Sequence, residues 1–218
     1  MEPLHVTAYV PGQVRITAPI ALDALLGYVV ATSSGLAPAA HEGELRPIEI
    51  PIAREPGGRF YLASFSVCRV AARELRYTNR RFPIAEAQMF GHGIKRLQIN
   101  AGPSKSFRIP HEALHVENGR LDWFCIGDRG EIAELLTFVP YLGKRRGVGY
   151  GRVAEWTVTP CTAWDGFPVM RNGRALRNLP VDWPGLDPDA LIVQRAPLDM
   201  PYWTQTRAEL VAVPEPVS

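Results

Sequence analysis

Extended and helical apolar patterns alternate along this chain in a definite order. Leu4–Val10 alternates apolar and polar residues with a period of two, which predicts a strand. The segment 19–35 then places leucine and valine side chains on one helical face, and Gly35 offers a stop for this helix. Residues 59–70 are rich in β-branched and aromatic residues, which predicts a second strand.

The same order returns in the second half of the chain. The Asn-Gly pair at 118–119 favours a hairpin turn, and an apolar strand follows it. Asp128 suits the N-cap of a helix that we expect over residues 130–143. Residues 151–160 alternate again with a period of two and predict a last strand.

Strand, helix, strand, strand, helix, strand is the order of the split βαβ arrangement. We therefore predict an α+β fold with a ferredoxin-like (RRM-like) βαββαβ core. The predicted domain spans residues 1–159 and includes a long insertion at 71–115. Residues 160–218 are rich in proline and hold three of the five tryptophans. We expect them to form a C-terminal extension packed on the core, with short strands near residues 190–195 and 208–213.

Composition limits the function only weakly. Hydrophobic residues make up 46% of the 218 residues, which is enough for a core, and a formal net charge of +2 selects no partner. The cysteines, Cys68, Cys125 and Cys161, form no CxxC pair, so we expect neither a metal site nor a disulfide framework, and no cofactor. No apolar run approaches the roughly 20 residues that cross a bilayer, and the N-terminus shows no signal-peptide pattern. A cytoplasmic protein without membrane contact is expected.

Charge is concentrated in the insertion. Residues 71–110 contain only two acidic residues, Glu74 and Glu86, against eight basic ones. The basic residues are Arg73, Arg76, Arg80, Arg81, Lys95, Arg96, Lys105 and Arg108. Aromatic residues are interleaved with them, and this combination suits base stacking together with phosphate contacts. A solvated loop is the alternative, but a local cation excess in a nearly neutral chain favours a contact with RNA or a partner protein.

A glycine-rich loop, LGKRRGVGYGRV at 142–153, connects the second predicted helix to the last predicted strand. It differs from the familiar nucleotide loops. A Rossmann fingerprint needs GxGxxG after a strand and at the start of a helix, whereas here the spacing differs and the helix comes first. A Walker A loop needs Lys followed by Ser or Thr at a helix start, and this is absent too. Both interpretations lose their physical basis, which is a phosphate bound at a helix N-terminus.

A polynucleotide backbone fits the loop better. Glycines allow backbone N–H groups to approach phosphates, the cations can neutralise several phosphates, and Tyr150 can stack on a base or ribose. A tight turn with solvated cations is the alternative, but three glycines at alternate positions are costly to order in a plain turn. The candidate RNA-binding residues of the loop are Gly143, Lys144, Arg145, Arg146, Gly147, Gly149, Tyr150, Gly151 and Arg152.

The helix, this loop and the following strand ending in EWTV together resemble the signature of the RAMP superfamily, the repeat-associated RNA-binding proteins of CRISPR systems. LHVTAYV and LDALL near the N-terminus and PYWTQTRAELVAVP at 201–214 narrow the resemblance. With them the chain is similar to the small RAMP subunit of type IV (Class 1) CRISPR effector complexes. The resemblance spans most of the chain, except residues 36–58 and 160–200.

The resemblance implies a non-catalytic, RNA-binding role in a ribonucleoprotein of antiviral defence. Such a subunit caps the 5′ handle of the CRISPR RNA (crRNA) and contacts a backbone RAMP subunit and the equivalent of the large subunit. The insertion would be a thumb laid across RNA or a neighbouring subunit, with Arg76, Arg80, Arg81, Lys95, Arg96, Lys105 and Arg108 as candidate RNA contacts. A contact of the insertion with target double-stranded DNA near the protospacer-adjacent motif (PAM) is compatible with this role.

Two enzyme hypotheses compete with the capping role. HEALH at 111–115 is a literal HExxH motif, but Pro110 precedes it and a predicted hairpin follows it, so we expect one short helical turn and no zinc site. Related RAMP proteins cleave guide RNA without metal, using a histidine as general acid or base. His5, His41 and His92 are the candidates, and His41, which follows the first helix, is the one to test. No catalytic residue is expected under the capping hypothesis.

Overall fold

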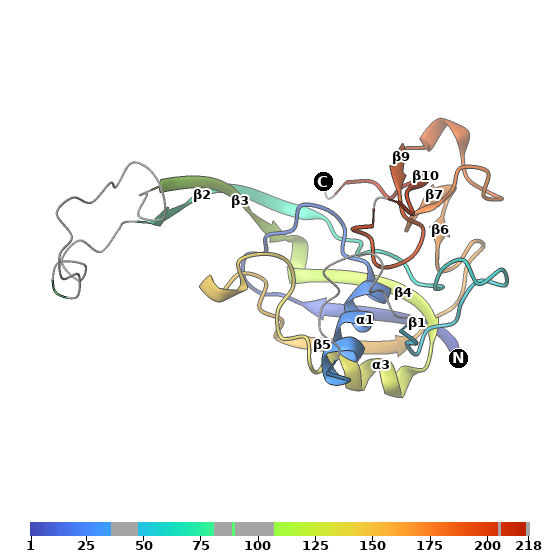
Figure 1. Cartoon of the computed structure of the whole chain (residues 1–218), viewed down its shortest axis with the longest axis horizontal. Coiled ribbons are helices and arrows are strands. Elements are labelled where there is room, and N and C mark those ends of the chain that lie inside the picture. The colour runs from blue at the N-terminus through green and yellow to red at the C-terminus, as the bar shows by residue number, and fades with distance from the viewer. Residues whose placement is uncertain (36–47, 81–88, 90–106, 205, 217–218) are drawn as a thin grey trace. The chain divides into compact units, whose positions relative to one another are not determined.

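The computed structural model describes residues 1–35, 48–80, 89, 107–204 and 206–216 (Figure 1). The chain divides into two compact units. One unit contains residues 1–72 and 114–218, and the other contains residues 73–113.

A three-stranded antiparallel sheet forms the centre of the larger unit. Strand β1 (Glu2–Tyr9) lies between β4 (Arg120–Gly127) and β5 (Glu155–Pro160). Val6 of β1 is opposite Trp123 on one neighbour and Val158 on the other. The strand predicted from the period-two pattern is confirmed. Alternate side chains of β1 are fully buried, and the intervening ones lie on the other face of the sheet.

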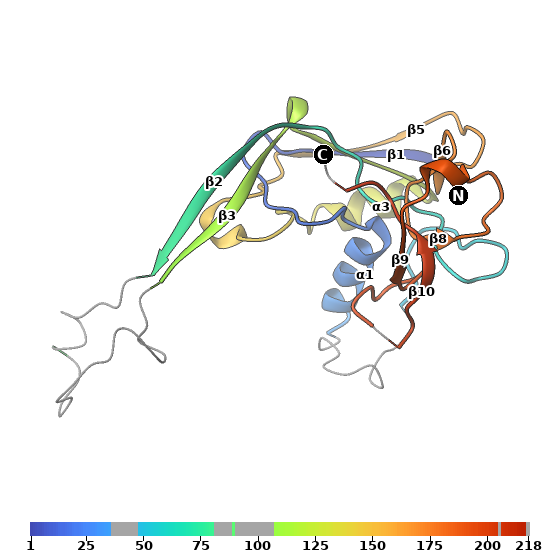
Figure 2. The ribbon, with the colours of Figure 1, turned by 90° about the horizontal axis from the view of Figure 1, so that it is seen from above.

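Helices α1 (Leu22–Ser33) and α3 (Arg129–Leu136) cover one face of this sheet, as Figure 2 shows. Their buried side chains join those of β1 and β4 in one hydrophobic core. Asp128 is the N-cap of α3, as predicted, and its carboxylate accepts a hydrogen bond of 2.9 Å from the Glu131 N–H. The helix ends at Leu136 rather than extending to 143, because Pro140 cannot donate the N–H that continued α-helix requires.

Residues 59–70 do not form the continuous strand that their composition predicts. They contribute isolated β-bridges, such as Ala63 with Cys125 and Val67 with Asp122 in β4. Their N–H groups donate to several different segments, so no repeating ladder with one neighbour forms. The donors are Leu62 (to Ala53), Ser64 (to Phe124), Phe65 (to Leu176), Ser66 (to Ile20) and Val67 (to Asp122).

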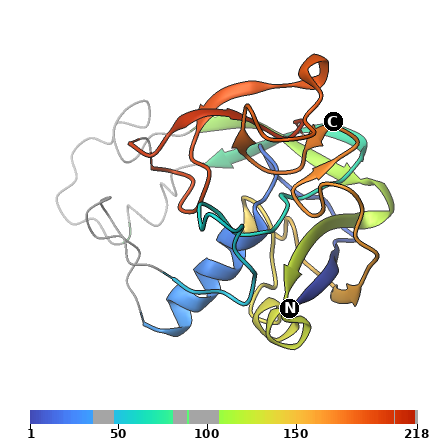
Figure 3. The same cartoon turned by 90° about the vertical axis from the view of Figure 1, so that its right-hand side faces the viewer.

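The C-terminal residues contain short strands and a second, smaller hydrophobic core. Strands β8 (Leu179–Pro180), β10 (Glu209–Ala212) and β9 (Val193–Ala196) form an antiparallel sheet in that order, visible at the top of Figure 3. Strands β6 (Met170–Arg171) and β7 (Arg174–Ala175) form a separate pair. The two short strands expected near 190–195 and 208–213 are therefore present.

The fold class is mixed α+β, as predicted, with few helices and several antiparallel sheets among the described residues. The ferredoxin-like assignment of the core and the boundary at residue 159 stay predictions. The turn between β3 (Phe107–Val116) and β4 is confirmed, because Asn118 and Gly119 both have positive φ, of 53° and 66°.

The smaller unit contains most of strand β3 and of strand β2 (Val70–Arg80), which pair with each other. Arg73 and Glu112 make an ion pair of 3.2 Å across it. HEALH lies within β3 and not in a helical turn, so that expectation is wrong. On a strand, residues four apart are separated by about 13 Å, so His111 and His115 cannot share a metal as they would on a helix.

Candidate nucleic-acid interface

The glycine-rich loop between α3 and β5 has a closed stem. The Leu142 N–H donates to the Gly151 carbonyl oxygen at 2.8 Å, and the Val153 N–H donates to the Pro140 carbonyl oxygen at 3.0 Å. Tyr141 and Arg152 add an antiparallel bridge between them. These backbone bonds hold the two ends of the loop together, so the residues between them protrude from a fixed base.

A second set of hydrogen bonds ties the stem to the segment that follows β1. The Gly151 N–H donates to the Gln13 carbonyl oxygen, and the Lys144 N–H donates to the Arg15 carbonyl oxygen, each at 2.8 Å. The loop is therefore anchored to a segment more than a hundred residues away in sequence, and the sequence contains no signal for this contact.

The four glycines of the loop have different structural roles. Gly143 and Gly151 have positive φ angles of 75° and 69°, and their α-carbons pack against backbone. A Cβ on Gly143 would lie 2.5 Å from the Arg15 carbonyl oxygen, and one on Gly151 would collide with the Leu142 carbonyl oxygen. Gly147 and Gly149, in contrast, meet nothing within 4 Å of an added Cβ.

The tip of the loop is a short 3-10 turn, η4 (Arg146–Val148), that faces open space. Arg145 precedes it with a φ of 62°, and Gly149 follows it with a φ of 89°. Left-handed backbone at these two positions turns the chain sharply around the tip. Gly147 has neither a positive φ nor a close neighbour, so folding itself does not require a glycine there.

The predicted cations surround this tip. Lys144, Arg146 and Arg152 are exposed, whereas Arg145 is half-buried. Within the part of the chain that the structure describes, none of the four belongs to an ion pair, and Arg145 Nε is a buried donor without a partner. Tyr150 is half-buried and already makes a contact within the protein. The structure thus brings the loop residues together as a cationic, backbone-rich protrusion.

The predicted contacts in the insertion are only partly described. Arg76 pairs with Glu74 at 2.5 Å, and the Arg108 guanidinium lies over the Tyr77 ring at 3.7 Å from its centroid. Arg80 is the last residue of β2. Arg81, Lys95, Arg96 and Lys105 lie outside the described residues.

Of the candidate histidines, His41 and His92 lie outside the described residues, and His5 lies on β1. His5 Nε2 is 2.8 Å from Asp122 Oδ1, and its ring stacks on Phe124 with centroids 4.9 Å apart. Thr7 donates a further hydrogen bond of 2.6 Å to Asp122 Oδ1. These contacts hold His5 between β1 and β4 on the sheet face opposite the helices.

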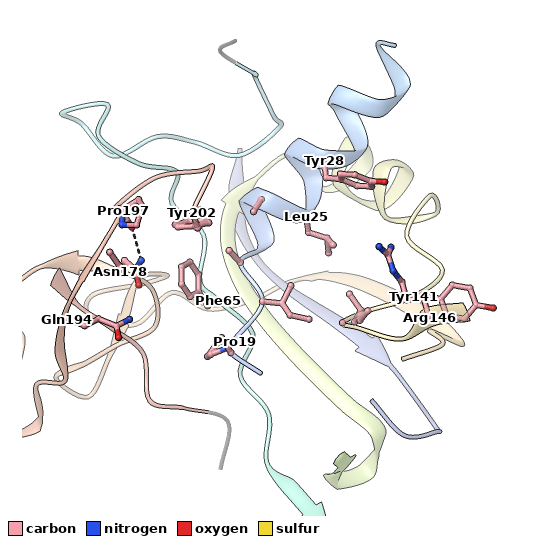
Figure 4. A pocket seen from close by; sticks show the side chains of 17 residues that line it. Pro19, Leu25, Tyr28, Phe65, Tyr141, Arg146, Asn178, Gln194, Pro197 and Tyr202 are labelled. Atoms are coloured by element: carbon pink, nitrogen blue, oxygen red, sulfur yellow. Dashed lines mark hydrogen bonds between the residues drawn. The ribbon is translucent and has the colours of Figure 1, made fainter. Parts of the chain in front are cut away.

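A groove of about 570 Å³ opens beside the glycine loop, and sequence reasoning missed it. Its walls come from α1, from the loop stem and from residues 178–202, as Figure 4 shows. On α1 the lining side chains repeat at helical spacing next to the core-facing stripe. They are Ala24, Leu25 and Tyr28, and Ala21, the N-cap residue, lines the groove just before the helix. This spacing is visible in the sequence, but nothing in the sequence places the other two walls beside it.

A buried polar network supports one wall of this groove. Tyr202, which lines it, donates a hydrogen bond of 2.7 Å to Asp23 Oδ2 of α1. Arg177 is 3.6 Å from the same carboxylate oxygen and donates to the Tyr202 hydroxyl at 3.0 Å. Burial raises the pKa of the Asp23 carboxyl, against the lowering effect of the Arg177 charge, and burial also raises the pKa of the Tyr202 phenol.

The described residues contain no cluster of three or more His, Cys, Asp or Glu side chains arranged to hold a metal ion. Among the same residues, no helix combines the length and the apolar character needed to span a membrane.

Comparison with known proteins identifies one family. The family model described as "CRISPR type IV associated protein Csf3" matches residues 82–214. The match includes the glycine-rich loop, strands β4 and β5 and most of the C-terminal residues, and it covers more than half of the chain. The comparison with curated proteins gives no match.

Proposed function

The chain belongs to the CRISPR type IV associated protein Csf3 family, and on that basis we propose that it caps the 5′ handle of the crRNA as a non-catalytic subunit. Family membership makes it a component of a type IV CRISPR effector complex, with other subunits of that complex as partners. The proposed RNA contact is the glycine-rich loop at 142–153.

One observation carries this proposal: the loop has a rigid stem and an open, cationic tip. The geometry of the stem requires glycine at positions 143 and 151. Folding does not require a glycine at position 147, and Gly147 lies among the exposed cations. A glycine at such a place lets a phosphate approach the backbone N–H groups, which a side chain would obstruct. The nearby Lys144 and Arg146 supply the charge that a polynucleotide backbone requires.

The architecture agrees with this role. The strand order β4-β1-β5, with both helices on one face, supports a ferredoxin-like core of the RAMP type. The loop follows the second helix of that core and precedes its last strand, where RAMP proteins carry their signature loop. The basic hairpin of β2 and β3 remains the proposed thumb for RNA, for a neighbouring subunit or for target DNA near the PAM.

The decisive experiment is the salt dependence of binding to single-stranded RNA of the repeat-derived 5′ handle. Replacing Lys144, Arg145 and Arg146 with Ala should weaken binding and reduce the slope of log K against log salt by about 2, since each single-strand phosphate contact contributes about 0.7. The matched control removes three cations from elsewhere, Arg59, Arg174 and Arg207. An affinity and slope equal to those of the control would refute the loop as the RNA contact.

Incubating the purified chain with repeat RNA tests the competing nuclease function. In buffer without metal the purified chain should leave repeat RNA intact. Cleavage that is lost in His41→Ala would replace the capping proposal with the endonuclease.

A further inference from the structure

The groove beside the glycine-rich loop has the chemistry of a nucleobase site. We propose that it binds one unpaired base of the strand whose backbone lies on the loop, so this inference rests on the proposed function. We call it the α1 groove, after the helix that forms one wall.

The lining of the groove is largely aromatic and apolar. Tyr28 lies on α1 with 60% of its surface exposed, and Tyr141 of the loop stem also lines the groove. Ala24 on α1 and Ala21 at its N-cap also line the groove, and their small side chains fill little of it. A base stacks on an exposed aromatic ring regardless of its identity, so such a lining attracts single-stranded RNA in general.

The groove is continuous with the glycine-rich loop. Arg146 begins the turn at the loop tip and also lines the groove, and its side chain points towards Tyr28 in Figure 4. Gly143, where the stem packs against Arg15, forms part of the same wall. A strand whose phosphates lie on the loop would therefore have a base within reach of the groove, with the Arg146 guanidinium between the two.

Two amide side chains, Asn178 and Gln194, also line the groove. Gln194 on β9 is exposed, and Asn178 is fixed because its side-chain N–H donates to the Pro197 carbonyl oxygen at 2.7 Å. An amide offers both a donor and an acceptor, which suits the edge of a base. The volume of about 570 Å³ lies within the roughly 300–1,000 Å³ typical of small-ligand sites.

One wall of the groove is held in place by buried hydrogen bonds and by ring packing. Tyr202 is held in place by Asp23 and Arg177, and its ring packs edge-on against Phe65, with centroids 5.1 Å apart. Both Tyr202 and Phe65 line the groove. A wall fixed by buried hydrogen bonds loses little conformational entropy when a base enters.

The test uses the full-length chain and a series of handle RNAs that each contain one abasic site. At one position the abasic RNA should bind the unchanged protein about tenfold more weakly than intact RNA. Tyr28→Ala should weaken binding of intact RNA about tenfold. This variant should bind the RNA with the abasic site at that position as tightly as it binds intact RNA. Its salt dependence should stay unchanged, because no charge is removed. Tyr9→Ala is the matched control, since Tyr9 is 43% exposed on β1 and outside the groove.

Leu25→Trp, which fills the groove from α1, gives an independent check and should also weaken binding about tenfold.

Suppose that both groove variants bind every RNA normally while the Lys144, Arg145 and Arg146 variant is impaired. The base site is then wrong and the capping function stands. If the loop variant also binds normally, the proposed function fails as well. If Leu25→Trp blocks assembly with other subunits but leaves RNA affinity intact, the groove binds protein and the inference is overturned.

Discussion

Gly147 and Gly151 lie four residues apart in the loop, but the structure gives them opposite constraints. Gly151 has left-handed backbone and no space for a side chain, whereas Gly147 has ordinary backbone and open surroundings. The sequence indicates a glycine-rich loop in both cases. The difference depends on where Leu142 and the Gln13–Arg15 segment lie in three dimensions, so no local pattern could reveal it.

This difference predicts opposite outcomes for the same substitution. Gly151→Ala should lower the free energy of unfolding by at least about 2 kcal/mol, because alanine disfavours the left-handed φ and its Cβ would collide with the Leu142 carbonyl oxygen. Gly147→Ala should change it by no more than about 0.5 kcal/mol, as for an unconstrained surface site, while weakening handle RNA binding. Urea denaturation and RNA titration of both variants measure this. Equal stability of the two variants would contradict the stem described above.

Among the secondary-structure elements, those with a local signal were predictable. Asp128 marks the start of α3 through its own side chain, and the Asn-Gly pair at 118–119 marks its turn through positive φ. Residues 59–70 have the composition of a strand, but they do not form a continuous hydrogen-bond ladder with one neighbouring strand. Their N–H groups donate instead to several distant segments. Composition reports a preference for extended backbone and burial, and it carries no information about which neighbour is present.

The pairing of β1 and β4 includes a polar cluster on the sheet face opposite the helices, centred on Asp122. Thr7 is directly opposite Asp122 in the register, and His5 approaches it from two residues away. Burial by itself would raise the pKa of the Asp122 carboxyl. The hydrogen bonds from His5 and Thr7, together with the charges of His5 and Arg120, outweigh burial, and this pKa is lowered.

The lowered pKa predicts a pH-dependent contribution to stability. A carboxyl with a depressed pKa in the folded state stabilises above its unfolded pKa of about 3.9, and this contribution is lost as the pH falls through the folded value. Asp122→Asn should therefore lower the free energy of unfolding by about 1–2 kcal/mol at pH 7 and by clearly less near pH 3. Urea denaturation across this range is the measurement, with Asp182→Asn, an exposed site, as control. If Asp122→Asn lowered the free energy of unfolding by the same amount at every pH, the ionised carboxylate could not be the source of the stabilisation.

At the scale of the larger unit, one buried cation connects the two hydrophobic cores. The Arg177 side chain is fully buried, donates to the carbonyl oxygens of Tyr61 and Leu198, and lies over the Phe60 ring of the smaller core. Through Asp23 it also contacts α1 of the larger core. The sequence gives no hint of this, since an arginine in a proline-rich segment ordinarily indicates solvent exposure.

Removing this cation should be among the most damaging single changes in the chain. Arg177→Met should lower the free energy of unfolding by about 3–5 kcal/mol, because Asp23 and the carbonyl oxygens lose a buried partner. Asp23→Asn alone should cost less, since Arg177 keeps its bonds to the Tyr61 and Leu198 carbonyl oxygens. The double variant should be less impaired than the sum of the two, because no carboxylate is then left buried without its cation. A double-mutant cycle by urea denaturation measures the coupling. Strict additivity would mean that Asp23 and Arg177 stabilise the unit independently, and that the groove wall built on Tyr202 does not depend on their contact.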